Sequence, residues 1–278
     1  MKEHTYTSER KDFFQRRAWS EMISEVWQAR ELLFRLISRD VSVRYRQSYF
    51  GYVWAVLPQL ATVAIFATLS SYRVFNMGAT EMPYVIHAVW SISVWQLFSA
   101  CLLGCSNSLV NSGTLITKVN FPKAVLVFSP VGHALLDFAI RLVPLICVMA
   151  WYNFLPSWQV VFVPVVLVFV IFLALGVGFI LSIINLVLRD AGSFLNIVMA
   201  FGVFLAPILY PPPVEAPFNL VNSLNPFSPL LIATQDMLSG ADSGYLGPML
   251  IMMGIALIVF LLGWRLFCIT MPRVAERA

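Results

Sequence analysis

The sequence contains very little charge for its length. Asp, Glu, Lys and Arg make up 12% of the 278 residues, whereas a soluble domain carries about 25%. Apolar residues make up 59%, and the mean hydropathy is +0.80. Because so few charged residues cannot cover a water-exposed surface, lipid must surround much of the chain. The composition therefore predicts an integral membrane protein.

Sequence motifs for catalysis and for binding nucleotides or metals are also missing. The chain has no Gly-x-x-x-x-Gly-Lys, Gly-x-Ser-x-Gly or His-Glu-x-x-His motif. Its three histidines, His4, His87 and His133, are far apart, and its four cysteines show no Cys-x-x-Cys spacing. We therefore expect no enzyme activity, no metal site and no cofactor in this chain.

Long apolar segments follow a polar N-terminal segment that shows no signal-peptide pattern. Six of them cover about residues 49–75, 83–104, 124–151, 158–188, 191–213 and 247–268. Each is long enough for the roughly 20 residues that a helix needs to cross a hydrocarbon core about 30 Å thick. The predicted fold class is an all-α integral membrane protein with six transmembrane helices. We divide the chain into a cytoplasmic segment (1–46), a transmembrane domain (47–270) and a cytoplasmic tail (271–278).

The basic residues are distributed unevenly about these spans. Of the 18 Lys and Arg, 16 fall in the N-terminal segment, after spans two and four, or at the C-terminal end. Cytoplasmic segments of membrane proteins carry an excess of Lys and Arg, so both termini are expected in the cytoplasm. The N-terminal basic residues are mixed with acidic ones, which suits a membrane-facing segment better than a nucleic-acid-binding arm. Arg265, near the end of span six, is expected to reach the membrane surface.

Three further segments are predicted not to span. Apolar residues recur at near-helical spacing from Glu21 to Gln47, with arginines between them, which predicts an amphipathic helix at the cytoplasmic interface. Ser106 to Lys123 is rich in Asn, Ser, Thr and Gly and predicts a polar loop. Ser228 to Leu238, followed by Gly240, predicts a short helix that is re-entrant or lies on the outer face.

Ionisable residues inside span three form a candidate functional group. His133, Asp137 and Arg141 are spaced four residues apart and therefore share one face of a helix. Ionisable residues within a membrane often serve as proton relays or contact anions. The alternative is structural, with Asp137 and Arg141 neutralising each other inside the protein. The sequence leaves both interpretations open.

Aromatic side chains are abundant and provide candidates for a sugar-binding path. Sugar rings pack their C–H faces against aromatic planes, whereas Trp and Tyr also gather at membrane interfaces for reasons unrelated to a substrate. The candidate path residues lie in spans one and two: Tyr49, Tyr52, Trp54, Trp90, Trp95 and Phe98.

Four groups of residues resemble a known family in the same order along the chain. They are Arg30-Glu31-Leu32 through Arg39-Asp40-Val41-Ser42-Val43-Arg44-Tyr45-Arg46-Gln47-Ser48 to Gly51-Tyr52-Val53-Trp54, then Asn120-Phe121-Pro122-Lys123, Arg189-Asp190 and Asn225-Pro226. Together they resemble the ABC-2 type permeases that export polysaccharides such as O-antigen, capsule and teichoic acid. The resemblance covers nearly the whole chain.

This resemblance implies a homodimer in the bacterial inner membrane, with each copy bound to a separate ABC ATPase subunit that holds the ATP and magnesium. The substrate would be a lipid-linked polysaccharide moved from the cytoplasm to the periplasm or cell surface, where further export partners could act. In this family the loop before span three contacts the ATPase, and the interface helix helps to gate substrate access. The implied coupling residues are Lys118, Asn120, Phe121, Pro122, Lys123, Arg30 and Arg39. The short external helix would form a gate.

A physical argument leads to the same arrangement. A hydrated polymer cannot cross hydrocarbon, so it needs a protein-lined path, and six helices of one chain leave little room for one. A dimer would place span one and the end of span five at a shared path, and the energy would come from a partner. Three alternatives remain: an ABC-2 permease for a drug or lipid, a proton-coupled transporter or channel that uses the span-three group, and an intramembrane enzyme.

Overall fold

A computed structural model describes most of the chain as a bundle of helices. The described residues are 16–45, 53–72, 82–113, 121–188, 190–210, 222–242 and 244–275, and they contain no strand. This confirms the predicted all-α class for the described residues. Four helices are long and apolar enough to cross a membrane. They are α4 (Tyr84–Asn111), α6 (Ala124–Trp151), α7 (Val163–Val187, preceded by the 3₁₀ turn η1, Trp158–Phe162) and α11 (Leu246–Ala275).

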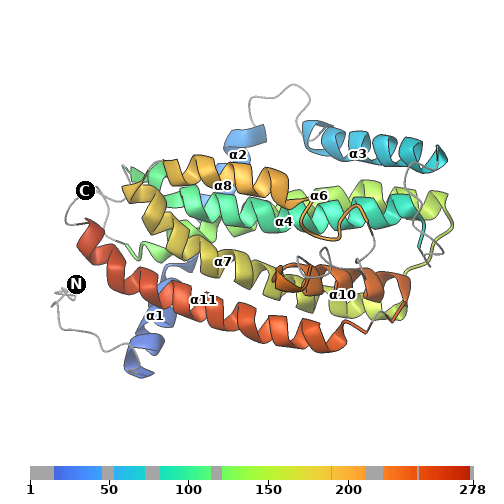
Figure 1. Cartoon of the computed structure of the whole chain (residues 1–278). Coiled ribbons are helices and arrows are strands. Elements are labelled where there is room, and N and C mark those ends of the chain that lie inside the picture. The colour runs from blue at the N-terminus through green and yellow to red at the C-terminus, as the bar shows by residue number, and fades with distance from the viewer. Residues whose placement is uncertain are drawn as a thin grey trace.

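These four helices lie side by side and correspond to predicted spans two, three, four and six (Figure 1). Glycines let α7 and α11 approach closely: a Cβ added to Gly263 would lie 2.1 Å from the carbonyl oxygen of Gly176. Aromatic rings fill the space beside this crossing, with Phe128 of α6 edge-on to Phe179 of α7 and Trp264 of α11. Small residues at a crossing are the usual means of close packing between membrane helices.

Predicted span one corresponds to α3 (Val53–Ser71), a helix of 19 residues that contacts α4 and α6. Figure 1 shows α3 at the edge of the bundle. Pro58 leaves one backbone hydrogen bond of this helix unmade, and the Thr62 hydroxyl donates to the Pro58 carbonyl at 2.8 Å. The remaining residues of the predicted span, 49–52 and 73–75, lie outside the described residues.

Predicted span five is wrong as a continuous helix. Helix α8 runs from Asp190 to Gly202 and has 13 residues, after which residues 203–208 form turns. Thirteen residues rise about 20 Å, which is less than the hydrocarbon thickness. The helix ends at a close contact, since a Cβ on Gly202 would lie 2.7 Å from the Trp95 ring. Pro207 cannot contribute a helical N–H shortly afterwards.

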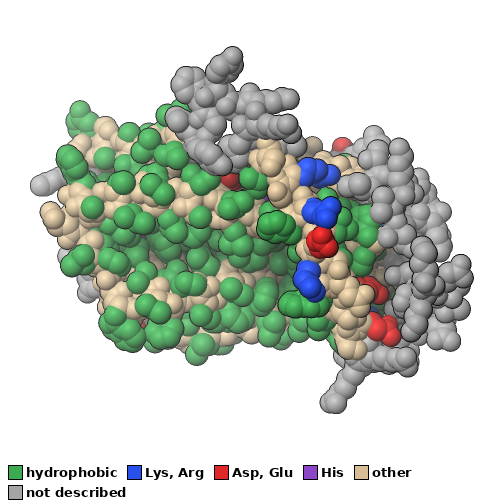
Figure 2. Space-filling model, turned by 180° about the vertical axis from the view of Figure 1, so that it is seen from behind, with side chains coloured by type: hydrophobic (Ala, Val, Ile, Leu, Met, Phe, Trp, Pro, Cys, Tyr) green, Lys and Arg blue, Asp and Glu red, His purple; other side chains and the backbone are tan. Residues whose placement is uncertain are grey.

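Charged side chains gather at one end of the bundle, beside α1 (Arg16–Gln28) and α2 (Arg30–Tyr45). Figure 2 shows hydrophobic side chains over most of one face and a band of Lys, Arg, Asp and Glu near one end. The exposed residues of α2 include Arg35 and Glu31, which pair at 2.8 Å. We call this end of the bundle, which also holds the last turns of α4, α7 and α11, the charged end. The single amphipathic helix expected here is divided into two at Ala29.

Arg265 corrects another expectation. Its side chain is 1% exposed, and its NH1 donates to the sulfur of Met22 at 3.4 Å. Helix α11 continues to Ala275, and α1 covers this part of it, so the guanidinium lies inside the protein rather than at the membrane surface. Ile23 and Trp27, on the other side of α1, are 56% and 68% exposed. Helix α1 therefore has one face on the bundle and one apolar face turned outward.

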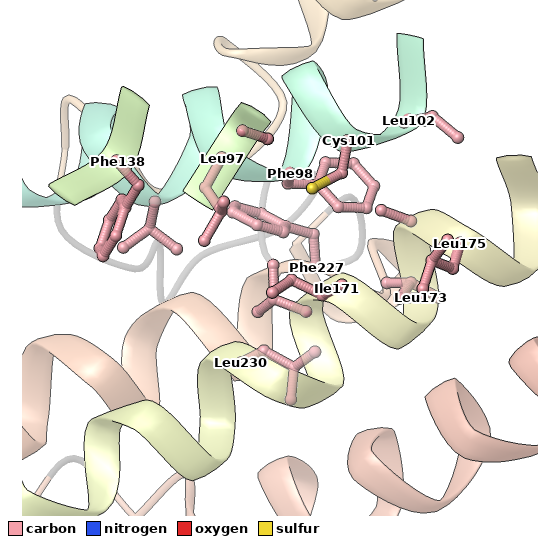
Figure 3. Close-up of a cluster of buried hydrophobic side chains, with 14 of the residues drawn as sticks. Leu97, Phe98, Cys101, Leu102, Phe138, Ile171, Leu173, Leu175, Phe227 and Leu230 are labelled. Carbon is pink, nitrogen blue, oxygen red and sulfur yellow. The ribbon is translucent and has the colours of Figure 1, made fainter. Parts of the chain in front are cut away.

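The short helix predicted after residue 228 is present as α10 (Ser228–Ser239), and it ends at Gly240 with a φ of 84°. Its first eight residues are all buried, and it contacts α4, α7 and α11. It lies at the end of the bundle opposite the charged end (Figure 1). Most of its residues are therefore covered by other parts of the chain. Figure 3 shows Phe227, just before α10, beside Phe98 of α4 and Ile171 of α7.

Candidate functional site

At the end of the predicted coupling loop, Phe121, Pro122 and Lys123 are described and lie at the charged end directly before α6. The Lys123 ammonium lies 4.5 Å from the centre of the Phe121 ring, a cation–π contact. Partial burial lowers the pKa of Lys123 below its usual value. Lys118 and Asn120 lie outside the described residues.

The expected start of this loop at Ser106 is wrong. Helix α4 continues to Asn111, and Ser106 and Ser108 are 1% and 5% exposed within it. The hydroxyl of Ser108 donates to the Cys105 carbonyl at 2.7 Å, so the polar side chain is satisfied inside the helix. Polar composition suggested a loop here, but local hydrogen bonds allow serines to stay in a buried helix. Residues 106–111 of the predicted loop therefore belong to α4.

Helix α2 lies directly against the first turns of α6. A Cβ on Gly132 would be 2.5 Å from the Ile37 side chain, so glycine is what allows this approach. The Ser129 hydroxyl also lies 3.5 Å from Oδ2 of Asp40 and donates to it. Because α6 starts immediately after Lys123, the interface helix and the segment before α6 both connect to the first turns of the same helix.

Arg30 and Arg39, the other two predicted coupling residues, are both exposed on α2. Arg39 donates to Oδ1 of Asp40 from Nε at 3.0 Å and from NH2 at 2.8 Å. The Arg30 guanidinium lies 5.3 Å from the centre of the Trp27 ring. Contacts between exposed charges contribute only about 0–1 kcal/mol. Both guanidinium groups can therefore exchange these contacts for those of a partner at little cost.

The candidate path residues of α4 are buried within this chain. Trp90, Trp95 and Phe98 are 4%, 8% and 8% exposed. The Trp90 indole N–H donates to the Thr234 hydroxyl of α10 at 3.0 Å. The Trp95 and Phe98 rings lie 5.2 Å and 5.0 Å from the ring of Phe227. In this conformation the three rings hold α10 against α4, and their role in a path stays a prediction.

The candidate path residues of span one lie at or beyond the start of α3. Tyr49 and Tyr52 lie outside the described residues, and so does the side chain of Trp54. The structure therefore leaves their predicted role as it stood.

The polar group of span three lies on α6 as expected. Nδ1 of His133 is 3.6 Å from Oδ2 of Asp137, and their side chains are 24% and 14% exposed. Arg141 follows one turn later and is partly buried. The structure thus places His133 beside Asp137. The sequence predicted that these residues share one helix face, but it did not predict this particular pair. Whether the group serves transport stays a prediction.

An apolar groove of about 450 Å³ lies between α3, α4 and α6. Its lining includes Val56, Leu60, Val63, Val143, Cys147 and Trp151. Hydrocarbon suits such a lining, whereas the hydroxyl groups of a glycan would lose their hydrogen bonds with water without replacement. This groove is therefore not a glycan path.

Helices α3 and α8 both carry exposed apolar side chains. On α8, Phe194, Ile197 and Phe201 recur every three or four residues and are 57% to 68% exposed. In the turns that follow α8, Phe204 and Leu205 are 60% and 54% exposed. On α3, Leu57, Leu60 and Ile65 are 45% to 56% exposed. Such faces meet either lipid or another protein surface.

Residues 31–239 match the family described as ABC-2 type transporter. The chain belongs to the ABC-2 transporter family. The matched region begins in α2 and ends with the last residue of α10. Both the interface helix and the short buried helix are therefore part of the ABC-2 region, and this chain is a membrane transport protein of that family.

Curated relatives share much of this ABC-2 chain. A protein named "O-antigen export system permease protein RfbA" from Myxococcus xanthus is 29% identical over 218 residues, covering 77% of this chain and 82% of the relative. Two proteins of the same name from Klebsiella pneumoniae are 24% and 23% identical over 219 residues, covering 77% of this chain and 83% of each relative.

Sequence reasoning missed two buried polar side chains. Asn185 is 3% exposed, and Arg265 is 1% exposed. Asn185 could have been singled out, because it is an amide within an otherwise apolar span, where polar side chains are expensive. The burial of Arg265 depends on α1 folding back over α11, which no local pattern indicates.

Proposed function

We propose that this chain is the membrane-spanning subunit of an ABC transporter that exports a lipid-linked polysaccharide across the bacterial inner membrane. The observation that carries the proposal is the similarity over 77% of the chain to proteins named as O-antigen export permeases in two different organisms. The ABC-2 match over residues 31–239 supports the same role. In this proposal the charged end faces the cytoplasm, in keeping with the excess of basic residues there.

The polysaccharide path would form between two copies of the chain. The groove between α3, α4 and α6 is apolar, and the aromatic rings of α4 are buried in the core. A hydrated glycan needs a polar, water-containing passage. The exposed apolar faces of α3 and α8 are the surfaces that a second copy would cover, and the water-containing path would run beside this apolar contact rather than through it.

The energy would come from a separate ABC ATPase that binds ATP and magnesium and docks at the charged end. Phe121, Pro122 and Lys123 offer an aromatic ring and an amine in front of α6. Helix α2 rests on the same helix through Gly132 and Ser129. A push on the coupling segment would therefore move α6 and the interface helix together.

Helix α10 would close the outer end of the path. It is held by the Trp90–Thr234 bond at 3.0 Å, by the Gln235 amide, which donates to Ser91 at 2.8 Å, and by a Gln235 bond to the Pro207 carbonyl at 3.1 Å. Hydrogen bonds of this kind fix one geometry but can be exchanged for others when a helix shifts. When α10 moves to open the outer end of the path, these three bonds would be replaced by others.

The test is co-purification of the tagged chain in mild detergent from cells that also produce the ABC ATPase of the same export system. We expect the complex to contain two copies of this chain and an equal number of ATPase subunits. Lipid-linked glycan should stimulate ATP hydrolysis by the complex. A chain that purifies without any ATPase, or a complex whose hydrolysis ignores the glycan, would overturn the proposal.

The apolar groove favours a second candidate, an ABC-2 permease that moves a lipid or an apolar drug. Its volume of about 450 Å³ and its lining suit a hydrocarbon chain. The two candidates separate in one comparison with the purified complex. If a phospholipid or apolar drug stimulates ATP hydrolysis while the lipid-linked glycan does not, the second candidate replaces the first.

A further inference from the structure

One buried amide side chain joins three helices at the charged end. Asn185 lies near the end of α7 and is 3% exposed. Its Nδ2 donates to the carbonyl oxygen of Ser106 at 3.2 Å and to Oδ1 of Asn107 at 2.8 Å, both in α4. Its Oδ1 accepts the backbone N–H of Gly192, in the first turn of α8, at 2.9 Å. We call Asn107, Asn185 and Gly192, with these bonds, the asparagine clasp.

The clasp requires specific residues at each of its positions. Nδ2 of Asn107 donates to the Leu103 carbonyl at 2.9 Å, which turns its oxygen toward Asn185. A Cβ on Gly192 would lie 2.9 Å from Oδ1 of Asn185 and 3.0 Å from Oδ1 of Asn107, so a larger residue would push the helices apart. Buried polar groups are stable only when their hydrogen bonds are made, and both ends of the Asn185 amide are satisfied.

The clasp also provides the N-terminal capping of α8. The first N–H groups of a helix have no partner within the helix and are usually capped by the residue just before it. Here the cap for Gly192 comes from α7, and the same side chain holds α4. Beyond this turn, side chains such as Phe194, Ile197 and Phe201 are exposed. The start of α8 is therefore held to the bundle by these directional bonds together with the buried side chain of Leu195.

The position of the clasp connects it with the proposed coupling segment. Asn107 is one turn before the end of α4 at Asn111, and the chain re-enters the described structure at Phe121. The coupling segment leads directly into α6, and the Cys105 thiol of α4 donates to the Val127 carbonyl of α6 at 3.1 Å, so a displacement of that segment can reach this end of α4 through α6. At this level the three bonds of Asn185 join α7 to both α4 and α8.

We propose that the asparagine clasp makes the charged ends of α4, α7 and α8 move as one unit, so that a displacement of the coupling segment is passed to α8. Asn185 is then a positioning residue that acts through α8, the helix whose exposed face would border the substrate path. The inference rests on the proposed function, because it needs an ATPase that pushes on the coupling segment.

The test uses the complete complex in lipid vesicles and measures ATP hydrolysis and glycan export in the same sample. Three variants break the clasp from three helices: Asn185→Leu, Asn107→Ala and Gly192→Ala. We expect each to hydrolyse ATP within about twofold of the wild type, while the glycan exported per ATP falls about tenfold, as expected for losing about one buried hydrogen bond. The matched control is Ser182→Ala, one turn away in α7, whose buried hydroxyl bonds only to the Phe179 carbonyl at 2.8 Å. It should keep the wild-type ratio.

A purely structural role would give a different result. Loss of folded protein would lower hydrolysis and export in the same proportion and leave their ratio unchanged, and that result would overturn the inference. Asn107 is only partly buried, so Asn107→Ala decides the matter if Asn185→Leu fails to fold. If the wild-type complex shows no ATP-dependent glycan export, the proposed function fails first, and the inference fails with it for that separate reason.

Discussion

The two ends of α4 are held in different ways from its middle. At the outer end, Trp90 and Ser91 bond to Thr234 and Gln235 of α10, and at the charged end Asn107 bonds to Asn185. Between them, Leu97, Phe98 and Cys101 pack in an apolar core (Figure 3). Apolar packing is dense and costly to disturb, whereas a hydrogen bond can be exchanged for another. The moving parts of this protein are therefore expected at its two ends, around a rigid middle.

The largest expected effect comes from breaking the rigid middle at the glycine crossing. Gly263→Leu would place side-chain atoms where a Cβ is already only 2.1 Å from the Gly176 carbonyl oxygen. Because backbone atoms cannot move aside, we expect more than the about 1–3 kcal/mol typical of overpacking, and loss of most folded protein. Size-exclusion chromatography in detergent measures this. Gly254→Leu is the matched control on the same helix, since a Cβ there meets no described atom within 4 Å.

Breaking the outer end should have a smaller effect. Thr234→Val keeps the shape of a side chain that is fully buried but leaves the Trp90 indole N–H without its acceptor at 3.0 Å. Such a loss costs about 1–3 kcal/mol, so we expect a lower melting temperature in detergent. The control is Thr62→Val on α3, where the exposed hydroxyl bonds to its own helix. It should change the free energy of unfolding by no more than about 0.5 kcal/mol and so barely change the melting temperature. Equal melting temperatures for the two variants would show that the Trp90 bond does not hold α10.

At the charged end, Phe121→Ala should weaken ATPase binding without unfolding the chain. The ring is partly exposed and contacts Lys123 at 4.5 Å, so its loss removes an aromatic contact from the proposed docking surface. Aromatic anchors of an interface often contribute about 2 kcal/mol or more, so we expect at least about tenfold weaker binding. Titration of the purified ATPase subunit measures it. Trp158→Ala, at the opposite end with its ring 73% exposed, should bind the ATPase normally.

The smallest effect is expected for the exposed pair on α2. Arg35 and Glu31 lie 2.8 Å apart with side chains 76% and 78% exposed. Neutralising either one should change stability by about 0.5 kcal/mol or less, because water and salt screen such pairs. A double-mutant cycle from thermal melts measures the coupling. A coupling energy above about 2 kcal/mol would mean that the charged surface of α2 stabilises the fold rather than being available to partners.

Much of the fold could be predicted from the sequence because hydrophobicity and length are local properties. The bounds of α6 match the expected span at both ends, and α10 begins and ends where Ser228 and Gly240 indicated. The errors have a common physical cause, which is contact with distant residues. Gly202 at the end of α8 lies against Trp95, and the Ser106 carbonyl of α4 accepts a hydrogen bond from Asn185, 79 residues away. Neither partner can be inferred from the neighbouring sequence.

The candidate site could be predicted only in part. The basic helix and the Phe121–Lys123 segment were visible as residue patterns, and the structure places both against α6. The aromatic residues Trp90 and Trp95 were equally visible in the sequence, but the sequence did not indicate that they face α10 and the residue before it. A pattern on one helix shows which side chains share a face, whereas what that face meets depends on the packing of the other helices.

The most direct test of the central claim is transport itself. Vesicles containing this chain and its ATPase, oriented with the charged end outside, would be given ATP and a fluorescent lipid-linked glycan from outside. The account predicts that glycan becomes protected inside the vesicles only when ATP and the ATPase are both present. Protection that needs neither of them, and instead follows a proton gradient across vesicles holding this chain alone, would contradict it.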